Sequence, residues 1–229
     1  WLAHQAQNTG VILGWAPFIQ SIQGIGKSFL GEVIRACLGD QNVGTVAPTQ
    51  VMDKFNGWAT NVAVNILEEM RIVGHNRHTV ANALKPLITD KIIQINDKGI
   101  KHFRTYNTTN YICFSNYKDA IPIDKDDRRW WVIFVNINSL EEFPDIVGES
   151  ANSYFEKLYS GLYNHAPEVR KWLLEYPISE EFKKMKRAPM TQDKLSMIQN
   201  EEENMEGLIE VMDEIEKGGV YYDELVISS

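Results

Sequence analysis

The chain has 229 residues, 44% of them apolar, and a formal net charge of −8 at pH 7. This is enough for one substantial hydrophobic core with a small second subdomain. No segment reaches the roughly 18 consecutive apolar residues of a membrane span, and residues 1–4 lack the pattern of a signal peptide. Within these residues we therefore expect neither a membrane span nor a signal peptide, and we expect a cytoplasmic protein. Because the chain begins with Trp1, we expect it to be a piece of a longer protein.

The two cysteines indicate the redox compartment of the protein, and the distribution of charge indicates which part could bind nucleic acid. Cys37 and Cys113 have neither the number nor the spacing of a disulfide framework or a metal site, which favours a reducing compartment. The net charge is −2 over residues 1–70, +5 over residues 71–131 and −11 over residues 132–229. Only the middle third is therefore suited to contact nucleic-acid phosphates.

Strand-like and helix-like segments alternate along the first 135 residues. Short apolar runs bounded by turn residues indicate buried strands, whereas apolar residues spaced three and four apart indicate helices. The expected strands are residues 16–22, 43–46, 62–67, 111–114 and 130–135. The expected helices are residues 28–36, 49–55 and 80–87, and Thr49 is the expected N-cap of the second.

Two regions depart from this alternation. Residues 91–95 and 101–104 flank Asn96-Asp97-Lys98-Gly99, a composition typical of a hairpin turn. After residue 135 the chain becomes acidic, and helices are expected at residues 151–164, 166–175 and 191–216.

The pattern as a whole predicts an α/β fold with a mostly parallel central sheet and helices on both faces. The β-hairpin is an insertion in that scheme, and the C-terminal region is helical. We expect an ATPase core over residues 1–140 and an acidic, mainly helical subdomain over residues 141–229.

A glycine-rich loop joins the first expected strand to the first long helix. In a phosphate-binding loop, glycines let backbone N–H groups converge on phosphate oxygens, a lysine neutralises the β and γ phosphates, and a Ser or Thr hydroxyl binds Mg²⁺. Ser21 stands where the general pattern has its first glycine, so we expect altered nucleotide affinity without loss of binding. The alternative is an ordinary strand-to-helix turn with an exposed lysine. The assigned nucleotide-binding residues are Gly24, Ile25, Gly26, Lys27, Ser28 and Phe29.

The third expected strand runs directly into Glu68 and Glu69. Hydrolysis of a phosphoanhydride needs one carboxylate that helps hold Mg²⁺ and another that orients or deprotonates the attacking water. We assign the metal to Glu68, together with Ser28, and the water to Glu69. The alternative is that the pair begins a solvated helix.

Polar residues also mark the last two strands. Asn116 follows the strand at 111–114, where its amide can hydrogen-bond the γ phosphate and the attacking water. Arg128 and Arg129 precede the last strand, and a guanidinium there can reach a neighbouring subunit's γ phosphate as an arginine finger. The alternatives are a strand-terminating asparagine, and arginines that pair with the aspartates of the same loop.

The order of these elements, with Phe114-Ser115-Asn116 followed by Asp127-Arg128-Arg129, resembles superfamily 3 helicases of the phage, plasmid and poxvirus primase-helicase type. The resemblance covers about residues 1–135. It implies a P-loop NTPase fold of the AAA+ type that uses ATP and Mg²⁺, with Ile66-Leu67-Glu68-Glu69 as Walker B. It also implies a homo-hexameric ring and an upstream primase or polymerase domain.

In that family a hairpin before the sensor strand grips single-stranded or forked DNA in the ring channel. Independently of the family, basic residues gather on and beside the expected hairpin turn, within the only net-positive third of the chain. The alternative is a hairpin tip kept soluble by lysines. The expected DNA-binding residues are Lys98, Lys101, His102 and Arg104.

Two functions remain open. The first is an ATP-driven DNA helicase or translocase that acts in the replication of a phage or other mobile element. The second is a nucleotide- and DNA-binding module that assembles without productive hydrolysis. Glu69 and the pair Arg128 and Arg129 favour the first, because a binding module needs neither a water-activating carboxylate nor an arginine acting in trans.

Overall fold

The computed structural model describes residues 1–70 and 76–216, and its centre is a five-stranded sheet in the order β2-β3-β6-β1-β7. All neighbouring strands pair in parallel, which confirms the expected α/β class and the mostly parallel sheet. The strands are β1 (Ala16–Gln20), β2 (Val43–Val46), β3 (Val64–Leu67), β6 (Asn110–Ser115) and β7 (Trp130–Phe134).

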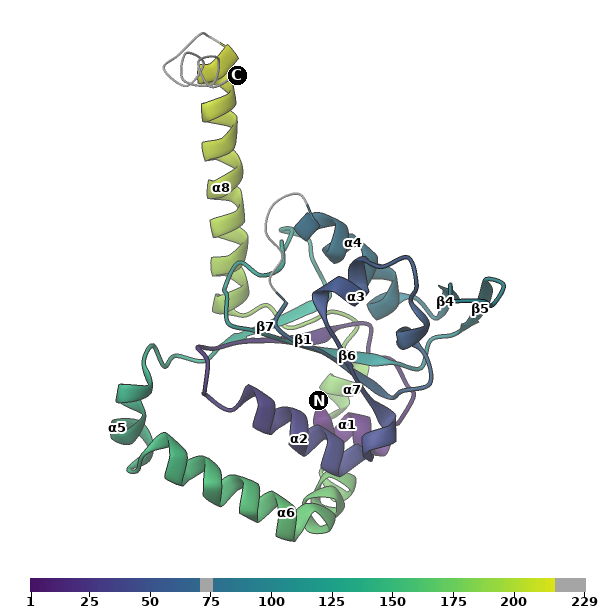
Figure 1. The fold of residues 1–229 in the computed structure, drawn as a ribbon, viewed down its shortest axis with the longest axis vertical. Helices are drawn as coiled ribbons and strands as arrows, with labels where there is room; N and C mark the ends of the chain where they lie inside the picture. Colours follow the sequence, from purple (N-terminus) through teal and green to yellow (C-terminus); the bar gives the residue numbers. More distant parts are fainter. Residues whose placement is uncertain (71–75, 217–229) are drawn as a thin grey trace.

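Helices cover both faces of this sheet, as Figure 1 shows. On one face α1 (Leu2–Gln7), α2 (Lys27–Leu38) and α6 (Ala151–Glu175) pack in a cluster that includes Ile34, Ile112 and Leu173. The opposite cluster includes Phe18, Leu84 and Ile198. It draws on α3 (Pro48–Met52), α4 (Asn76–Thr89) and α8 (Gln192–Glu216). Parallel strands need such cover, because both faces of their sheet are apolar.

Several helix boundaries differ from those expected. The second helix begins at Pro48 with Ala47 as its N-cap, so Thr49 lies inside it and the expected cap is wrong. Proline suits the first helical position, and the Gln50 side chain accepts the Ala47 amide hydrogen at 2.9 Å. The helices expected at 151–164 and 166–175 are confirmed as the two parts of α6, which is kinked at His165, two residues before Pro167.

The remaining helices lie outside the alternating pattern. The short helices α5 (Phe143–Val147) and α7 (Glu180–Lys184) were not expected. The final helix α8 extends away from the body of the molecule (Figure 1). Across the described residues, no helix combines the length and apolar character needed to cross a membrane.

The expected hairpin is present as β4 (Ile92–Ile95) and β5 (Phe103–Tyr106), an antiparallel pair separate from the main sheet. Its loop is longer than the tight turn expected, because β5 begins only at Phe103 and leaves Lys101 and His102 in the loop. Asn56 holds the loop end of β4. Its amide N–H donates to the Asn96 carbonyl at 2.9 Å, and its side-chain oxygen accepts from the Asn96 amide at 2.7 Å.

Both cysteine thiols are buried in this core, and burial raises the pKa of Cys37 and, more strongly, of Cys113. The unfolded chain therefore loses its thiol protons at a lower pH than the native chain does. We expect the free energy of unfolding to fall as pH rises above about 8.5, and the native thiols to resist iodoacetamide at pH 8. Mass spectrometry with and without denaturant checks this, and rapid labelling of the native chain would contradict it.

Candidate functional site

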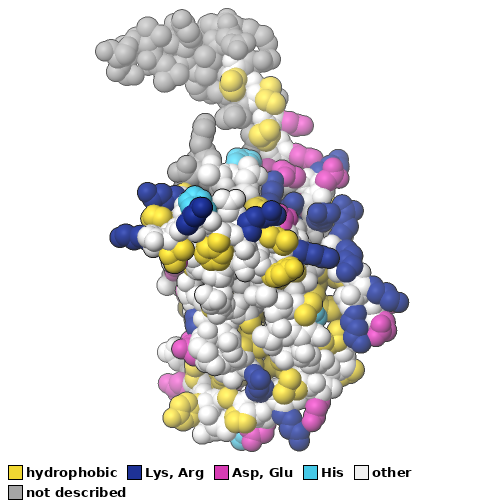
Figure 2. All heavy atoms as spheres, turned by 90° about the vertical axis from the view of Figure 1, so that its right-hand side faces the viewer, with side chains coloured by type: hydrophobic (Ala, Val, Ile, Leu, Met, Phe, Trp, Pro, Cys, Tyr) yellow, Lys and Arg dark blue, Asp and Glu magenta, His cyan; other side chains and the backbone are white. Residues whose placement is uncertain are grey.

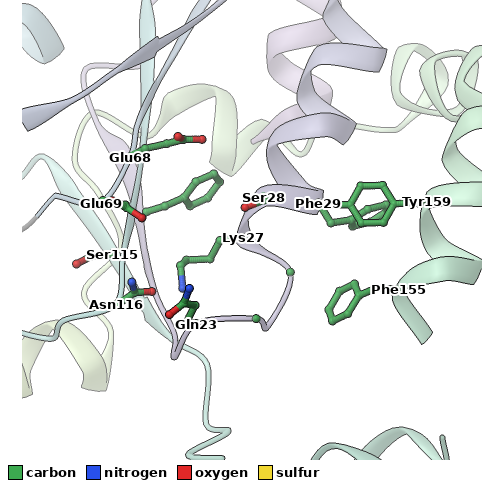
Figure 3. A pocket seen from close by; sticks show the side chains of 13 residues that line it. Gln23, Lys27, Ser28, Phe29, Glu68, Glu69, Ser115, Asn116, Phe155 and Tyr159 are labelled. Atoms are coloured by element: carbon green, nitrogen blue, oxygen red, sulfur yellow. The ribbon is translucent and has the colours of Figure 1, made fainter. Parts of the chain in front are cut away.

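The candidate site lies where β1, β3 and β6 end side by side. Their register pairs Gln20 with Ser115 and Leu67 with Cys113, so the residues that follow each strand meet at one edge of the sheet. They surround a cavity of about 390 Å³, shown in Figure 3. The lining includes the expected residues Gly24, Gly26, Lys27, Ser28, Phe29, Glu68, Glu69 and Asn116, together with Gln23, Phe114, Ser115, Phe155 and Tyr159.

The glycine-rich loop takes its shape from two left-handed residues. Gly24 and Gly26 have φ of 87° and 88°, a region that favours glycine. Ser21 has no positive φ, so a serine fits where the general pattern has glycine. Ile25 is not among the residues that line the cavity, whereas the other residues assigned to nucleotide binding are.

The Lys27 ammonium is turned back onto its own loop. Its Nζ donates to the Ser21 carbonyl at 2.9 Å, the Ser21 hydroxyl at 2.8 Å and the Ile22 carbonyl at 3.0 Å. Burial lowers the pKa of Lys27, and the negative charge of Glu69 partly offsets that shift. All three acceptors are neutral oxygens, so an anion in the cavity offers this ammonium a stronger partner.

Glu69 has an unusual backbone for a residue with a side chain. Its φ is 50°, a conformation that costs an L-residue about 1–2 kcal/mol. The residues on either side hold it there, because the Glu68 amide donates to the Val46 carbonyl at 3.1 Å and the Met70 amide to the Phe114 carbonyl at 3.3 Å. Such strain persists where the surrounding structure enforces it, and it concentrates at functional sites.

Asn116 and Ser115 end the neighbouring strand. The side-chain oxygen of Asn116 is buried and has no hydrogen-bond partner among the described residues, so it is free to bind a ligand. The Ser115 hydroxyl donates to the Met70 carbonyl at 3.0 Å and accepts from the Tyr117 amide at 3.0 Å. Ser115 thereby connects the end of β6 to the segment that carries Glu69, a role that sequence reasoning missed.

An aromatic wall closes the cavity opposite these polar groups (Figure 3). Phe29 belongs to α2, and its ring lies 5.1 Å from that of Tyr159 on α6 in an edge-to-face arrangement. Phe155, one helical turn before Tyr159, lies so close to Gly26 that a Cβ there would be 2.7 Å from its ring. The spacing of the two α6 aromatics is visible in the sequence, but where α6 docks is not.

The arginine pair lies at the other end of the sheet. The Ala16 amide donates to the Arg129 carbonyl at 2.7 Å, which places Arg129 beside the start of β1. The glycine-rich loop follows the other end of β1. Four residues of strand separate the two ends by roughly 13 Å. Arg129 pairs with Asp127 at 3.3 Å, while Arg128 is exposed and makes no ion pair within residues 1–70 and 76–216. Neither arginine is thus brought to this chain's own cavity.

The four expected DNA-binding residues are all exposed on the hairpin. Lys98 lies in its loop beside Gly99, whose φ is 76°, and His102 Nδ1 lies 3.4 Å from the Gln94 amide. Figure 2 views the molecule from the hairpin side, where Lys and Arg side chains are concentrated on the upper half of the described body. Two further exposed lysines extend the positive charge beyond the hairpin loop. Lys91 directly precedes β4 in the sequence, and Lys54 lines the same surface hollow as Arg104.

The fold and site together define a parallel α/β domain with a glycine-lysine loop, an acidic pair and an asparagine around one cavity. Residues 19–129 match a family described as "Family of unknown function (DUF5906)". The chain is also 25% identical over 213 residues to a DNA primase-polymerase of Nitratiruptor phage NrS-1. That match covers 87% of this chain and 28% of the phage protein.

Solved structures of the NrS-1 C-terminal region share this fold. One apo structure has a TM-score of 0.71 and 27% identity, and covers 87% of this chain and 45% of the solved chain. An A-form apo structure of the same region has a TM-score of 0.67 at the same identity and coverage. The chain therefore spans less than half the length of the relatives that it matches.

The strain at Glu69 can be tested without any ligand. Glu69→Asn and Glu69→Gln both remove the negative charge, but asparagine tolerates the left-handed region far better than glutamine does. We expect Glu69→Asn to exceed Glu69→Gln in free energy of unfolding by about 0.5–1 kcal/mol, measured by urea denaturation. Equal stability of the two variants would contradict an enforced backbone at this position.

Proposed function

We propose that this chain is the ATP-hydrolysing motor domain of a DNA helicase or translocase that acts in the replication of a phage or other mobile element. The proposed class is a P-loop NTPase of the AAA+ type, close to superfamily 3 helicases. One observation carries the proposal: Lys27, Ser28, Glu68, Glu69 and Asn116, from three separate strand ends, line a single cavity. Similarity to a phage DNA primase-polymerase supports the replication role.

The residues of the cavity suit the parts of this reaction. The backbone N–H groups of the loop at Gly24 and Gly26 would donate hydrogen bonds to the phosphates. Lys27 would exchange its three neutral acceptors for phosphate oxygens. Glu69 would orient or deprotonate the attacking water, since it lines the same cavity as Lys27. Asn116 would accept a hydrogen bond from the attacking water at its unpartnered side-chain oxygen and donate one to the γ phosphate from its side-chain N–H.

A magnesium ion fits the donors at this site. Ser28 and Glu68 both line the cavity and supply hydroxyl and carboxylate oxygens, the ligands that Mg²⁺ prefers. When bound, Mg²⁺ would neutralise charge that develops on the phosphates. Ser28 lies in the first turn of α2, where the helix dipole also favours the phosphates.

We propose that hydrolysis takes place between subunits of a homo-hexameric ring. Arg128 and Arg129 lie at the opposite end of β1 from the cavity, so only a neighbouring copy could bring them to a given nucleotide. Arg128 is the better candidate finger, because it is exposed and Arg129 is engaged by Asp127. An arginine supplied in trans is worth on the order of a thousand-fold or more in kcat.

The hairpin is the proposed DNA-gripping element. Its exposed basic residues would contact the phosphates of single-stranded or forked DNA without reading sequence. We place the motor core in residues 1–140. We place the acidic helical subdomain in residues 141–229; its helices α6 and α8 pack onto the core. In the full-length protein, an upstream primase or polymerase domain and action in the host cytoplasm complete the proposal.

The second candidate is a module that binds nucleotide and DNA without hydrolysis. The strained backbone of Glu69 argues against it, because a binding module has no use for a carboxylate held at such a cost. Measured turnover decides between the two.

Two substitutions test hydrolysis. Lys27→Ala removes the phosphate-binding ammonium, and Glu69→Gln removes the base while it keeps the side-chain size. We expect each to lower DNA-stimulated ATP turnover of the full-length protein by on the order of a hundred-fold or more. Glu69→Gln should still bind ATP, as measured with a fluorescent analogue. Normal turnover in either variant would sink the assignment.

A charge substitution tests the hairpin. Lys98→Ala combined with Lys101→Ala should weaken single-stranded DNA binding and reduce its salt slope by about 1.4, since each lost lysine contact contributes about 0.7. Basal ATP turnover should remain. The control removes two exposed lysines of α6, Lys157 and Lys171. Equal affinities and salt slopes for the two double variants would remove the hairpin from the DNA path.

A further inference from the structure

Lys194, in the first turn of α8, is fully buried although lysine is among the residues least often buried. Its Nζ donates to the Asp127 carbonyl at 2.7 Å and to the Asp127 carboxylate at 3.2 Å. The Asp127 side chain is only 4% exposed. This buried ion pair lies outside the cavity and takes no part in the chemistry proposed there.

Asp127 in turn holds the backbone of the arginine pair. Its Oδ1 accepts the amide hydrogens of Arg129 at 2.8 Å and Trp130 at 3.0 Å, and its Oδ2 lies 3.3 Å from the Arg129 guanidinium. Arg128 lies between Asp127 and Arg129 in the sequence, and its own side chain is exposed. The position of Arg128 therefore depends on an aspartate whose charge Lys194 balances.

We call the Lys194–Asp127 pair, with the hydrogen bonds that Asp127 accepts from residues 129 and 130, the anchor. The segment that leads into α8 adds hydrogen bonds to this anchor along β7. The Ala188 amide donates to the Arg128 carbonyl at 2.8 Å, and the Thr191 hydroxyl donates to the Val132 carbonyl at 2.7 Å. The Phe134 amide donates to the Asp193 carboxylate at 2.7 Å. Residues 188–194 thus cover the open edge of the last strand of the sheet, from just before its start to its end.

We propose that Lys194 is a positioning residue that presents Arg128 to the nucleotide of the neighbouring subunit. The proposal rests on ATP hydrolysis at subunit interfaces, as set out above. Lys194 acts through Asp127 and touches no nucleotide. Loss of its charge would release the arginine of its own chain and so slow hydrolysis at the next subunit's site, while its own nucleotide site stays intact.

Lys194→Met keeps the length of the side chain but leaves the Asp127 carboxylate without its ammonium. We expect kcat to fall by at least about ten-fold, as for a misplaced arginine finger, with nucleotide affinity within about two-fold of the parent. Lys194→Arg, which keeps the charge, should recover part of the rate. Lys171→Met, on the exposed face of α6, is the matched control and should hydrolyse normally. Parent-like turnover of Lys194→Met would overturn the proposal.

A mixing experiment separates an effect in trans from damage to the chain's own site. Full-length Lys194→Met supplies an intact cavity, and full-length Lys27→Ala supplies an intact arginine. An equal mixture should regain turnover at about a quarter of its interfaces, those that combine the two intact halves. Mixed assemblies that remain as inactive as each variant alone would show that Lys194 serves its own site, which contradicts the proposal.

Amide hydrogen exchange reads the anchor without any hydrolysis. Lys194→Met should exchange faster at residues 128–130 than the parent and Lys171→Met do, with no change over residues 19–29. If the parent itself hydrolyses no ATP, the proposed function fails, and unchanged exchange at 128–130 separately refutes the anchor. Should Lys194→Met not fold, Lys194→Met combined with Asp127→Asn removes both members of the Lys194–Asp127 pair. The same fall in kcat is expected, because Arg129 also loses its aspartate partner and the backbone at Arg128 is released.

Discussion

The parallel pairing of β3, β6 and β1 is the constraint on which the rest of the site depends. Because Gln20 lies beside Ser115 and Leu67 beside Cys113, whatever follows these strands must emerge at one edge of the sheet. No loop has to fold back across the sheet to bring the ammonium, the carboxylates and the amide together. The helices complete the arrangement, since α2 begins within the loop itself and, together with α6, supplies the aromatic wall.

Most of this edge could be predicted from the sequence, for a local reason. Lys27, Glu68 and Asn116 each follow an apolar run, and apolar runs identify buried strands without knowledge of their neighbours. The aromatic wall and the buried Lys194 could not be predicted, because they depend on where α6 and α8 dock, far along the chain from their partners. The sequence pattern also predicted the wrong N-cap for α3, because the Gln50 side chain binds the Ala47 amide and the helix begins at Pro48.

In the conformation described, the polar groups of the cavity are in unequal states. Lys27 is satisfied by the neutral oxygens of its own loop, whereas the Asn116 side-chain oxygen is buried without a partner. Glu69 is held in a backbone conformation that most residues avoid. An anion that reached the cavity would compete with the loop for Lys27, while the backbone around Glu69 would not have to rearrange. Glu69 is thus already held in a fixed conformation, whereas Lys27 has to give up hydrogen bonds to its own loop before it can bind an anion.

The contact between Phe155 and Gly26 adds a second reason for glycine at position 26. Position 26 favours glycine for its positive φ, and in this backbone conformation a Cβ there would also meet the Phe155 ring at 2.7 Å. A smaller residue at 155 would remove the clash but not the backbone requirement. The side chain that α6 brings to the loop therefore restricts position 26, although more than a hundred residues separate Gly26 from Phe155 in the chain.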